Sequence, residues 1–400
     1  MPRKILFVCH PDHGHIIPSL DMVSELTSRG HEVLYLTAPS MRDIVARTGA
    51  TVLEYDSRYR DADFTRLAEE PGYLLSVLLD DSAAMLDTAL SGVEGIDGVV
   101  YDTSVLYAGR ILARRWAVPS VQLIPFFASN EKFSYLNAMY NDAGGDAPAP
   151  ERPAEMPEWV GATMRRIGEL CATHGVDVAP HELWFEVPDC SLVTIPRAFQ
   201  YEGDSFDERF TFVGPCVGER GFLGEWTPPA EKRPVVLASL GAVFNEREDI
   251  FRAVVEAFRG QPWHAVVTVA EGTDPESFGV LPPNVEVHRW VPHVTVLEHA
   301  ALCVTHGGMG TVMEALRSGT PLVCLPTSPL DRPTGWRLGE LGLGVLLDPA
   351  DATPEQLVEA IRSVLADRDM AEAAERMRKE VADAGGSVRA ADRIERHLAR

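Results

Sequence analysis

Short apolar runs alternate with amphipathic segments along the whole sequence, which predicts an α/β protein built from two doubly wound parallel sheets. The chain has 400 residues, 46% of them hydrophobic, which exceeds the usual size of one domain and suffices for two full cores. Residues 216–233, rich in Gly, Pro and charges, interrupt the pattern near its middle. We therefore predict an N-terminal domain at residues 1–215, a linker at 216–233, a second domain at 234–385 and a C-terminal helix at 386–400.

The N-terminal half opens on an apolar run at residues 5–9, followed by a polar turn and an amphipathic helix that we place at about 18–29. Pro18 suits a first helical turn, so we expect His13, Gly14 and His15 to lie in the loop at the carboxyl end of the first strand. Doubly wound folds bind their ligands at that edge. Further strands are predicted at 32–37, 51–54, 98–101, 120–124, 192–195 and 210–213, with helices at 73–90 and 107–116.

Residues 130–158 are rich in Pro, Gly and acids with little periodicity, which predicts a loop or lid. The aromatic residues beside it are candidates for lining a pocket for a large apolar ligand, although each is equally compatible with core packing. They are Phe126, Phe127, Phe133, Tyr135 and Tyr140.

The second half has predicted strands at 235–239, 265–269, 284–288, 300–304, 322–325 and 345–347, and a helical pattern at 354–400. After the strand at 300–304, the segment Thr-His-Gly-Gly-Met-Gly-Thr leads into a helix that we place from about residue 312. Its glycines let the backbone approach a phosphate, the helix start offers free N–H groups, and His306 and Thr311 add donors. This turn predicts a phosphorylated ligand, whose nucleobase could stack on Trp290 and whose ribose could donate to Glu314.

The charge and composition exclude several classes of protein. A net charge of −23 and a pI near 4.9 argue against nucleic acid and anionic membrane surfaces as partners. The apolar run at the N-terminus is too short for a signal peptide, and no run approaches the ~20 residues of a membrane span, so we expect a soluble cytoplasmic protein. Six scattered cysteines without a Cys-x-x-Cys pair predict reduced core residues.

Trp-Val-Pro-His at 290–293, the glycine-rich segment at 305–311 and Glu314 resemble, in order and spacing, the donor-binding signature of nucleotide-sugar-dependent glycosyltransferases. The spacing is that of the bacterial macrolide and natural-product branch. The alternative is a turn of purely structural glycines in an unrelated α/β protein. The resemblance implies a GT-B fold, in which two Rossmann-like domains face each other across a cleft and the last helix returns to the first domain. It implies these donor-binding residues: Gly241, Ala242, Trp290, Val291, His293, His306, Gly308, Gly310, Thr311, Glu314, Leu330 and Asp331.

The N-terminal half supplies the predicted catalytic residues. Gly14-His15-Ile16-Ile17-Pro18 matches the family's Gly-His-x-x-Pro stretch, so His15 is the predicted general base, since neutral imidazole accepts a proton near pH 7. Asp102 ends a strand, matches the family's Asp and is the predicted partner that orients His15. The structural alternatives are that His15 caps its helix and that Asp102 is an N-cap. His13 is the competing base, and the predicted acceptor pocket contains His13, Phe126, Phe127 and Tyr135.

The sequence departs from the family pattern at three places. Ala242 replaces a Ser, and His293 stands where a Gln usually approaches the ribose. The Asp-Gln pair that holds hexose hydroxyls falls on Leu330 and Asp331, or on Asp331 and Arg332 after a shift of one residue, so the amide is absent either way. A site of this kind predicts a deoxysugar donor carried by thymidine diphosphate.

No metal or other cofactor is expected. Asp-x-Asp triplets occur at 61–63 and 367–369, but neither follows an apolar strand, so we interpret both as solvated loop charges. The helix start, His306 and Thr311 would then neutralise the diphosphate.

The predicted function is that of an inverting O-glycosyltransferase acting on a small apolar natural product such as a macrolide, polyketide or flavonoid. A non-catalytic nucleotide-sugar-binding helper protein and a sugar-nucleotide epimerase are the alternatives. We expect a nucleotide sugar and a small-molecule acceptor as ligands, and a monomer or homodimer. The sequence leaves open the acceptor, the sugar, and the choice between uridine and thymidine nucleotides.

Overall fold

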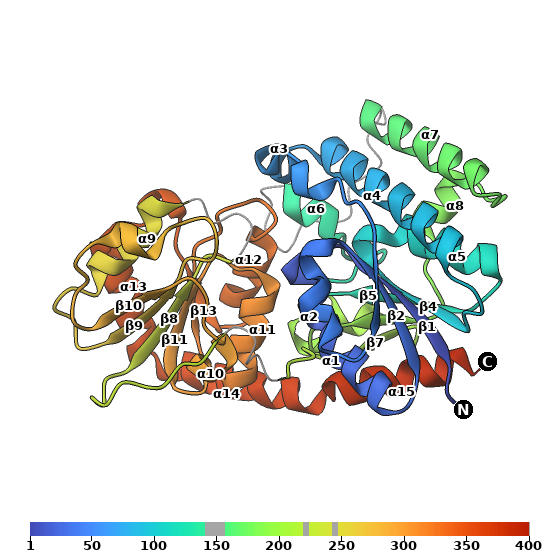
Figure 1. Cartoon of the computed structure of the whole chain (residues 1–400). Helices are drawn as coiled ribbons and strands as arrows, with labels where there is room; N and C mark the ends of the chain where they lie inside the picture. Colours follow the sequence, from blue (N-terminus) through green and yellow to red (C-terminus); the bar gives the residue numbers. More distant parts are fainter. Residues whose placement is uncertain (141–156, 219–223, 242–246, 400) are drawn as a thin grey trace.

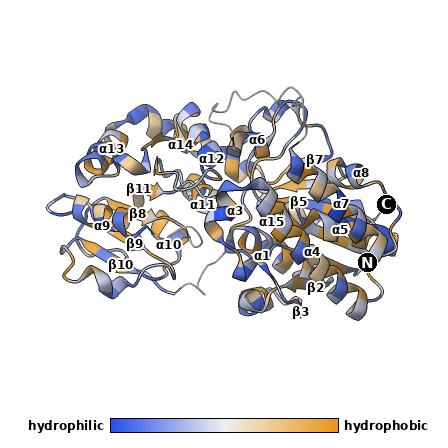
Figure 2. Cartoon of the chain, turned by 90° about the horizontal axis from the view of Figure 1, so that it is seen from above, coloured by the Kyte–Doolittle hydropathy of each residue, from blue (hydrophilic) through white to orange (hydrophobic). Residues whose placement is uncertain are grey.

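The computed structural model describes residues 1–140, 157–218, 224–241 and 247–399 (Figure 1). These residues form two parallel sheets, one in each half of the chain. The first has the strand order β3-β2-β1-β4-β5-β6-β7 and the second β10-β9-β8-β11-β12-β13. Helices cover both sheets, and hydrophobic residues concentrate on the strands between them (Figure 2). The predicted class, an α/β protein with two Rossmann-like doubly wound domains, is confirmed.

All strand pairings of both sheets are parallel, and the strands are largely buried, as expected for sheets covered on both faces. Every strand coincides with a predicted one to within two residues. The first sheet contains β1 (Lys4–Val8), β2 (Glu32–Thr37), β3 (Thr51–Glu54), β4 (Gly98–Asp102), β5 (Ser120–Ile124), β6 (Ser191–Val193) and β7 (Phe210–Phe212). The second contains β8 (Val235–Ser239), β9 (His264–Thr268), β10 (Val285–His288), β11 (Ala300–Thr305), β12 (Leu322–Cys324) and β13 (Gly344–Leu346).

The helices connect these strands and pack on both faces of the sheets (Figure 1). Those of the first half are α1 (His13–Ser28), α2 (Arg42–Ala46), α3 (Phe64–Glu69), α4 (Pro71–Gly92), α5 (Leu106–Trp116), α6 (Tyr135–Tyr140), α7 (Glu158–Thr173) and α8 (Pro180–Phe185). Those of the second half are α9 (Glu248–Ala257), α10 (His293–Leu297), α11 (Met309–Ser318), α12 (Arg332–Glu340), α13 (Pro354–Ala366), α14 (Arg368–Asp383) and α15 (Gly386–Leu398).

Two helices begin earlier than predicted. The side chain of Asp12 accepts a hydrogen bond from the N–H of Gly14 at 2.7 Å and caps α1, so the helix starts at His13 and Pro18 lies inside it. His13, Gly14 and His15 therefore form the first turn of a helix, and the prediction of a loop there was wrong. Likewise α11 starts at Met309, so Gly310 and Thr311 belong to its first turn.

The predicted loop and linker also differ from the structure. Residues 135–140 of the predicted loop form α6, while residues 141–156 lie outside the described part of the chain. In the linker, which we expected to cross no core, Trp226 is buried and its indole N–H donates to Glu286 Oε1 at 3.2 Å. The linker is therefore anchored to β10, the edge strand of the second sheet.

The C-terminal segment crosses from the second half to the first (Figure 1). After α14 the chain turns at Gly385 and Gly386, both with positive φ, and α15 then packs on α1. Arg29 at the end of α1 donates to Asp392 at 2.7 Å and to Glu395 at 2.8 Å, both on α15. This agrees with the return of the last helix that the resemblance implied; the residue boundaries of the domains stay predictions.

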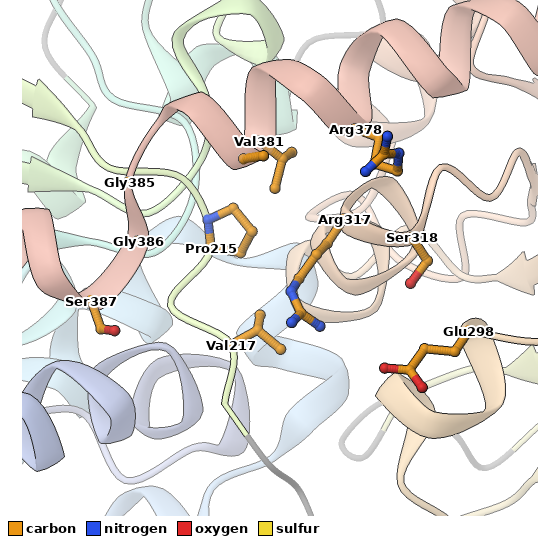
Figure 3. A pocket seen from close by; sticks show the side chains of 11 residues that line it. Pro215, Val217, Glu298, Arg317, Ser318, Arg378, Val381, Gly385, Gly386 and Ser387 are labelled. Atoms are coloured by element: carbon orange, nitrogen blue, oxygen red, sulfur yellow. The ribbon is translucent and has the colours of Figure 1, made fainter.

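A cavity of about 560 Å³ lies at this crossover (Figure 3). Its walls come from the linker, the ends of α10, α11 and α14, and the glycine turn. None of the predicted donor, acceptor or catalytic residues lines it, so the candidate active site lies elsewhere.

All six cysteines lie in the described part of the chain, where each is buried and none forms a disulfide bond, as predicted. Within the described residues, none of the helices combines the length and apolar character needed to cross a membrane.

Candidate active site

His15 and Asp102 meet where the order of the first sheet reverses. His15 follows β1 and Asp102 ends β4, and these two strands are neighbours at the point where consecutive connections change direction, which is the ligand-binding edge of doubly wound folds. Nδ1 of His15 lies 2.9 Å from Oδ2 of Asp102. The structure thus brings together the two residues that were predicted to act as a pair.

Asp102 holds His15 with one oxygen and caps a helix with the other. Its carboxylate is fully buried, and Oδ1 accepts a hydrogen bond from the N–H of Ser104 at 2.7 Å. The contact with His15 and the N-cap are therefore both present, and the catalytic role of the pair stays a prediction. Because a buried carboxylate accepts from Nδ1–H, the proton of neutral His15 resides on Nδ1, and Nε2 is left to accept another.

The charge of Asp102 changes the proton affinity of His15. Burial lowers the pKa of His15, but the charge of Asp102, its hydrogen bond and the charge of Asp12 all raise it, and the net result is a pKa above the ordinary value. The side chain of His15 is still 18% exposed, so the ring is partly open to solvent.

Aromatic side chains pack next to His15. Phe126 packs edge-on to the imidazole with ring centres 5.8 Å apart, and Tyr135 lies 4.7 Å from Phe126. Both are only partly buried, and their place in an acceptor pocket stays a prediction. Phe127 was predicted there too, but its ring is 1% exposed and stacks on Phe199 in the core.

The ring of His13, predicted in the acceptor pocket, contacts the second half of the chain. It stacks on Trp290 of the second half, with ring centres 5.7 Å apart and planes inclined by 27°. Trp290 is only partly buried, and its indole N–H donates to Glu271 at 3.2 Å. His13 therefore lies beside the predicted nucleobase platform, and Trp290 is not a core residue.

The glycines around His306 leave space for its ring. A Cβ at Gly241 would lie 2.5 Å from the imidazole, and a Cβ at Gly308 would lie 2.4 Å from Nε2. Both distances are far shorter than a van der Waals contact, so only glycine fits on these two sides of His306. Nδ1 of His306 is buried without a hydrogen-bond partner among the described residues. A buried nitrogen of this kind lacks the partner that buried polar atoms normally have.

The N-terminus of α11 forms the rest of the predicted diphosphate site. Gly308 is the N-cap residue, and no side chain among the described residues caps the helix, so its first N–H groups can face an anion. A Cβ at Gly310 would meet no atom within 4 Å, which shows that the helix opens to solvent there. Thr311 lies in the same first turn. Ala242, also predicted here, lies outside the described residues.

The predicted ribose site contains His293 and Glu314. Nε2 of His293 lies 3.0 Å from Thr268 Oγ1, and Nδ1 lies 3.7 Å from Glu314 Oε2. Burial lowers the pKa of His293 to about 4, so it is neutral near pH 7 and its contact with Glu314 is not an ion pair there. Val291 is 2% exposed and belongs to the core, which leaves only its backbone for a ligand.

Leu330 and Asp331, the residues of the predicted sugar site, make different contacts. Asp331 is buried, accepts hydrogen bonds from the N–H and hydroxyl of Ser328 at 3.1 and 2.8 Å, and lies 3.9 Å from Nε2 of His306. The carbonyl of Leu330 accepts from the hydroxyl of Tyr135 at 3.3 Å. The predicted sugar and acceptor residues thus meet between the two halves.

Both Asp-x-Asp triplets contribute helix caps. Asp63 accepts from the N–H groups of Thr65 and Arg66, and Asp367 accepts from the N–H of Met370 at 2.9 Å. We had interpreted them as loop charges. They are exposed, as predicted, but they have a structural role.

Three residues near His15 were not predicted from the sequence, namely Asp12, Tyr59 and His10. The hydroxyl of Tyr59 donates to Asp12 at 3.1 Å, and the ring of His10 lies 5.0 Å from that of His15. Only Asp12 carries a local signal, as an N-cap residue type directly before a helix. The other two come close only through the fold.

The features described above define the class of the GT-B glycosyltransferases. They are two Rossmann-like domains with parallel sheets, a His–Asp pair in the first domain and a glycine-rich helix start in the second. Comparison with known proteins agrees. Residues 261–395 match the family model described as "Erythromycin biosynthesis protein CIII-like, C-terminal domain". The chain therefore has the C-terminal domain expected of this class.

Curated relatives and solved structures match the chain over nearly its whole length. It is 36% identical to demethyllactenocin mycarosyltransferase of Streptomyces fradiae, over 98% of this chain and 86% of that protein. It is 34% identical to oleandomycin glycosyltransferase of Streptomyces antibioticus, over 99% and 91%. The structure of the calicheamicin glycosyltransferase CalG4 superposes with a TM-score of 0.87 at 38% identity, covering 100% of this chain and 99% of that one. The chain belongs to the natural-product glycosyltransferases, and it is an enzyme that transfers sugars to natural products.

Proposed function

We propose that this enzyme is an inverting O-glycosyltransferase that moves a sugar from a nucleoside diphosphate to a hydroxyl group of a small, largely apolar natural product. The observation that carries the proposal is the 2.9 Å contact between His15 and the buried Asp102. Helix α1, which carries His15, meets the first turn of α11 around a small cavity lined by Ile17, Pro18, Met309 and Gly310. A base and an anion site thus lie on adjoining helices.

The reaction takes place in one displacement. The acceptor hydroxyl gives its proton to Nε2 of His15, and its oxygen forms a bond to the anomeric carbon. The bond between that carbon and the diphosphate breaks, and its electron pair leaves with the diphosphate. Attack opposite the leaving group inverts the anomeric carbon. Asp102 stabilises the imidazolium that forms.

In this proposal the leaving diphosphate is stabilised without a metal ion. Among the described residues, the N–H groups at the start of α11 have no side-chain cap and Nδ1 of His306 has no hydrogen-bond partner. Together with the hydroxyl of Thr311, they would supply donors where the negative charge develops. The glycines at 241 and 308 support this role because they hold the His306 ring in a space that no other residue would leave open.

Trp290→Ala should weaken the binding of nucleoside diphosphates by roughly 1–3 kcal/mol, because a base stacked on an aromatic ring contributes that much. Calorimetry with the nucleoside diphosphate and with inorganic diphosphate separates the two parts of the ligand, and only the first should lose affinity. Trp184→Ala, which removes another partly buried tryptophan that packs in the first half, is the matched control. A lower melting temperature with unchanged nucleotide affinity would assign Trp290 to folding alone.

For the donor we propose a thymidine diphosphate deoxysugar, held by Asp331 through a remaining hydroxyl. Leu330 offers no side-chain partner to a sugar hydroxyl, and an unpaired buried hydroxyl costs roughly 1–3 kcal/mol. Asp331 supports the proposal because it lies beside His306, next to the predicted diphosphate site.

Competition between donors tests the proposed function together with this preference. A macrolide aglycone is offered a thymidine diphosphate deoxysugar, thymidine diphosphate glucose and uridine diphosphate glucose, and the glycosides are quantified by mass spectrometry. The deoxysugar should show the highest kcat/KM, and the two glucose donors separate the effect of the sugar from that of the base. A higher kcat/KM for glucose contradicts the preference, and unchanged kinetics in Asp331→Ala removes that residue from the site.

A further inference from the structure

The carboxylate of Asp12 is fixed by two hydrogen bonds beside the general base. Oδ1 accepts from the N–H of Gly14 at 2.7 Å as the N-cap of α1, and Oδ2 accepts from the hydroxyl of Tyr59 at 3.1 Å. His15 is three residues further along, in the first turn of the same helix. The carboxylate therefore lies at the end of the helix where His15 must gain a positive charge.

Tyr59 is itself held by a buried carboxylate. Asp81 on α4 is fully buried and accepts hydrogen bonds from Tyr55, Ser57 and the N–H of Arg58, which fixes the segment before Tyr59. The ring of Tyr59 then packs edge-on to His10 with ring centres 4.2 Å apart. Its hydroxyl reaches Asp12 from a well-defined position.

A helix N-terminus is an unfavourable place for an imidazolium. The free N–H groups of the first turn carry partial positive charge, and burial also disfavours the charged ring. A carboxylate at the N-cap offsets both effects. Burial lowers the pKa of His15, whereas the charges of Asp102 and Asp12 raise it.

The other titratable groups around His15 do not supply this compensation. Burial and the proximity of His15 lower the pKa of His10 well below its ordinary value, so His10 stays neutral. Burial raises the pKa of the Cys9 thiol near Asp102 and of the Tyr59 phenol, so both stay protonated. Asp102 and Asp12 are the carboxylates whose charges raise the pKa of His15.

We propose that Asp12, oriented by Tyr59, is a positioning residue that stabilises the imidazolium of His15 while the acceptor proton is on it. The inference rests on the proposed function, in which His15 is the base. It adds a second carboxylate to the His15–Asp102 pair and a tyrosine that keeps this carboxylate in place.

Asp12→Asn removes the charge and keeps the cap, because asparagine caps a helix as well as aspartate does. Its amide nitrogen would then donate to the Tyr59 hydroxyl, where the carboxylate had accepted. The imidazole of His15 is titrated by NMR in the unliganded protein, with its resonance assigned by its loss in His15→Ala. We expect the titration and the acid limb of kcat/KM to move to lower pH, and turnover to fall roughly two- to fivefold. Tyr59→Phe, which keeps the ring and removes the hydrogen bond, should shift both in the same direction by less.

Asp367→Asn makes the same change at the N-cap of α14 in the other half of the chain and should leave the titration unchanged. If Asp12→Asn titrates as the wild type does, the inference is overturned, even where lower stability reduces turnover at every pH. The proposed function fails separately, when His15→Ala keeps its turnover. Because the NMR titration needs no substrate, the two failures are distinguishable.

Discussion

His15→Ala should lower turnover on a hydroxyl acceptor by about 100-fold or more while leaving donor affinity nearly unchanged, since a lost general base typically costs that much. The reason is geometric. His15 lies on α1 of the first half, paired with Asp102 at 2.9 Å, whereas the predicted nucleotide-binding residues lie in the second half. Turnover is measured at saturating donor, and donor affinity is measured by calorimetry on the same preparations.

His181→Ala is the matched control, because His181 is an exposed histidine on α8 of the same half. It should behave as the wild type. If His15→Ala also kept wild-type turnover, the assignment of the base would be wrong, and His13 would be the next residue to test. A parallel loss of donor affinity would instead place His15 in the donor site.

Asp102→Asn should also lower turnover by roughly 100-fold or more, through the tautomer of His15. The asparagine oxygen can still accept from the N–H of Ser104, which preserves the cap. Its amide nitrogen then donates to Nδ1 of His15, where the carboxylate had accepted. Nε2 would then carry the proton of neutral His15 and could not accept one from the acceptor.

The same substitution should change the pH dependence. The base must be neutral, so activity rises with pH through the pKa of His15, and the raised pKa places the acid limb above the ordinary range of histidine. Removing the charge of Asp102 lowers that pKa and moves the limb to lower pH. Asp348→Asn, at an N-cap in the second half, is the control. A variant with the wild-type limb and wild-type turnover would show that Asp102 serves only as a cap.

The strands could be predicted because parallel strands buried on both faces are continuous apolar runs. The start of α1 could not be predicted correctly, because Pro18 is typical of a first helical turn and suggested a start near residue 18. The helix begins at His13 instead, where Asp12 caps it. Helix α6 was not predicted because its six residues lie in a segment whose composition is typical of loops. In the structure this helix packs on α12 of the other half, a contact that the local sequence does not show.

The proximity of His15 to Asp102 could be predicted because His15 follows β1 and Asp102 ends β4, and the carboxyl ends of these neighbouring strands lie at one edge of a parallel sheet. Contacts between residues that are far apart in the sequence could not be predicted. The stacking of His13 on Trp290 joins the two halves, and the hydrogen bond from Tyr59 to Asp12 joins residues 47 positions apart. No local pattern encodes either contact.

The most direct test of the account is the anomeric configuration of the product. A donor of known configuration is incubated with a macrolide aglycone, and the glycoside is examined by NMR while the released nucleoside diphosphate is quantified. The account predicts a glycoside of opposite configuration and one nucleoside diphosphate for each sugar transferred. A glycoside of retained configuration, or an epimerised donor without glycoside, would contradict it.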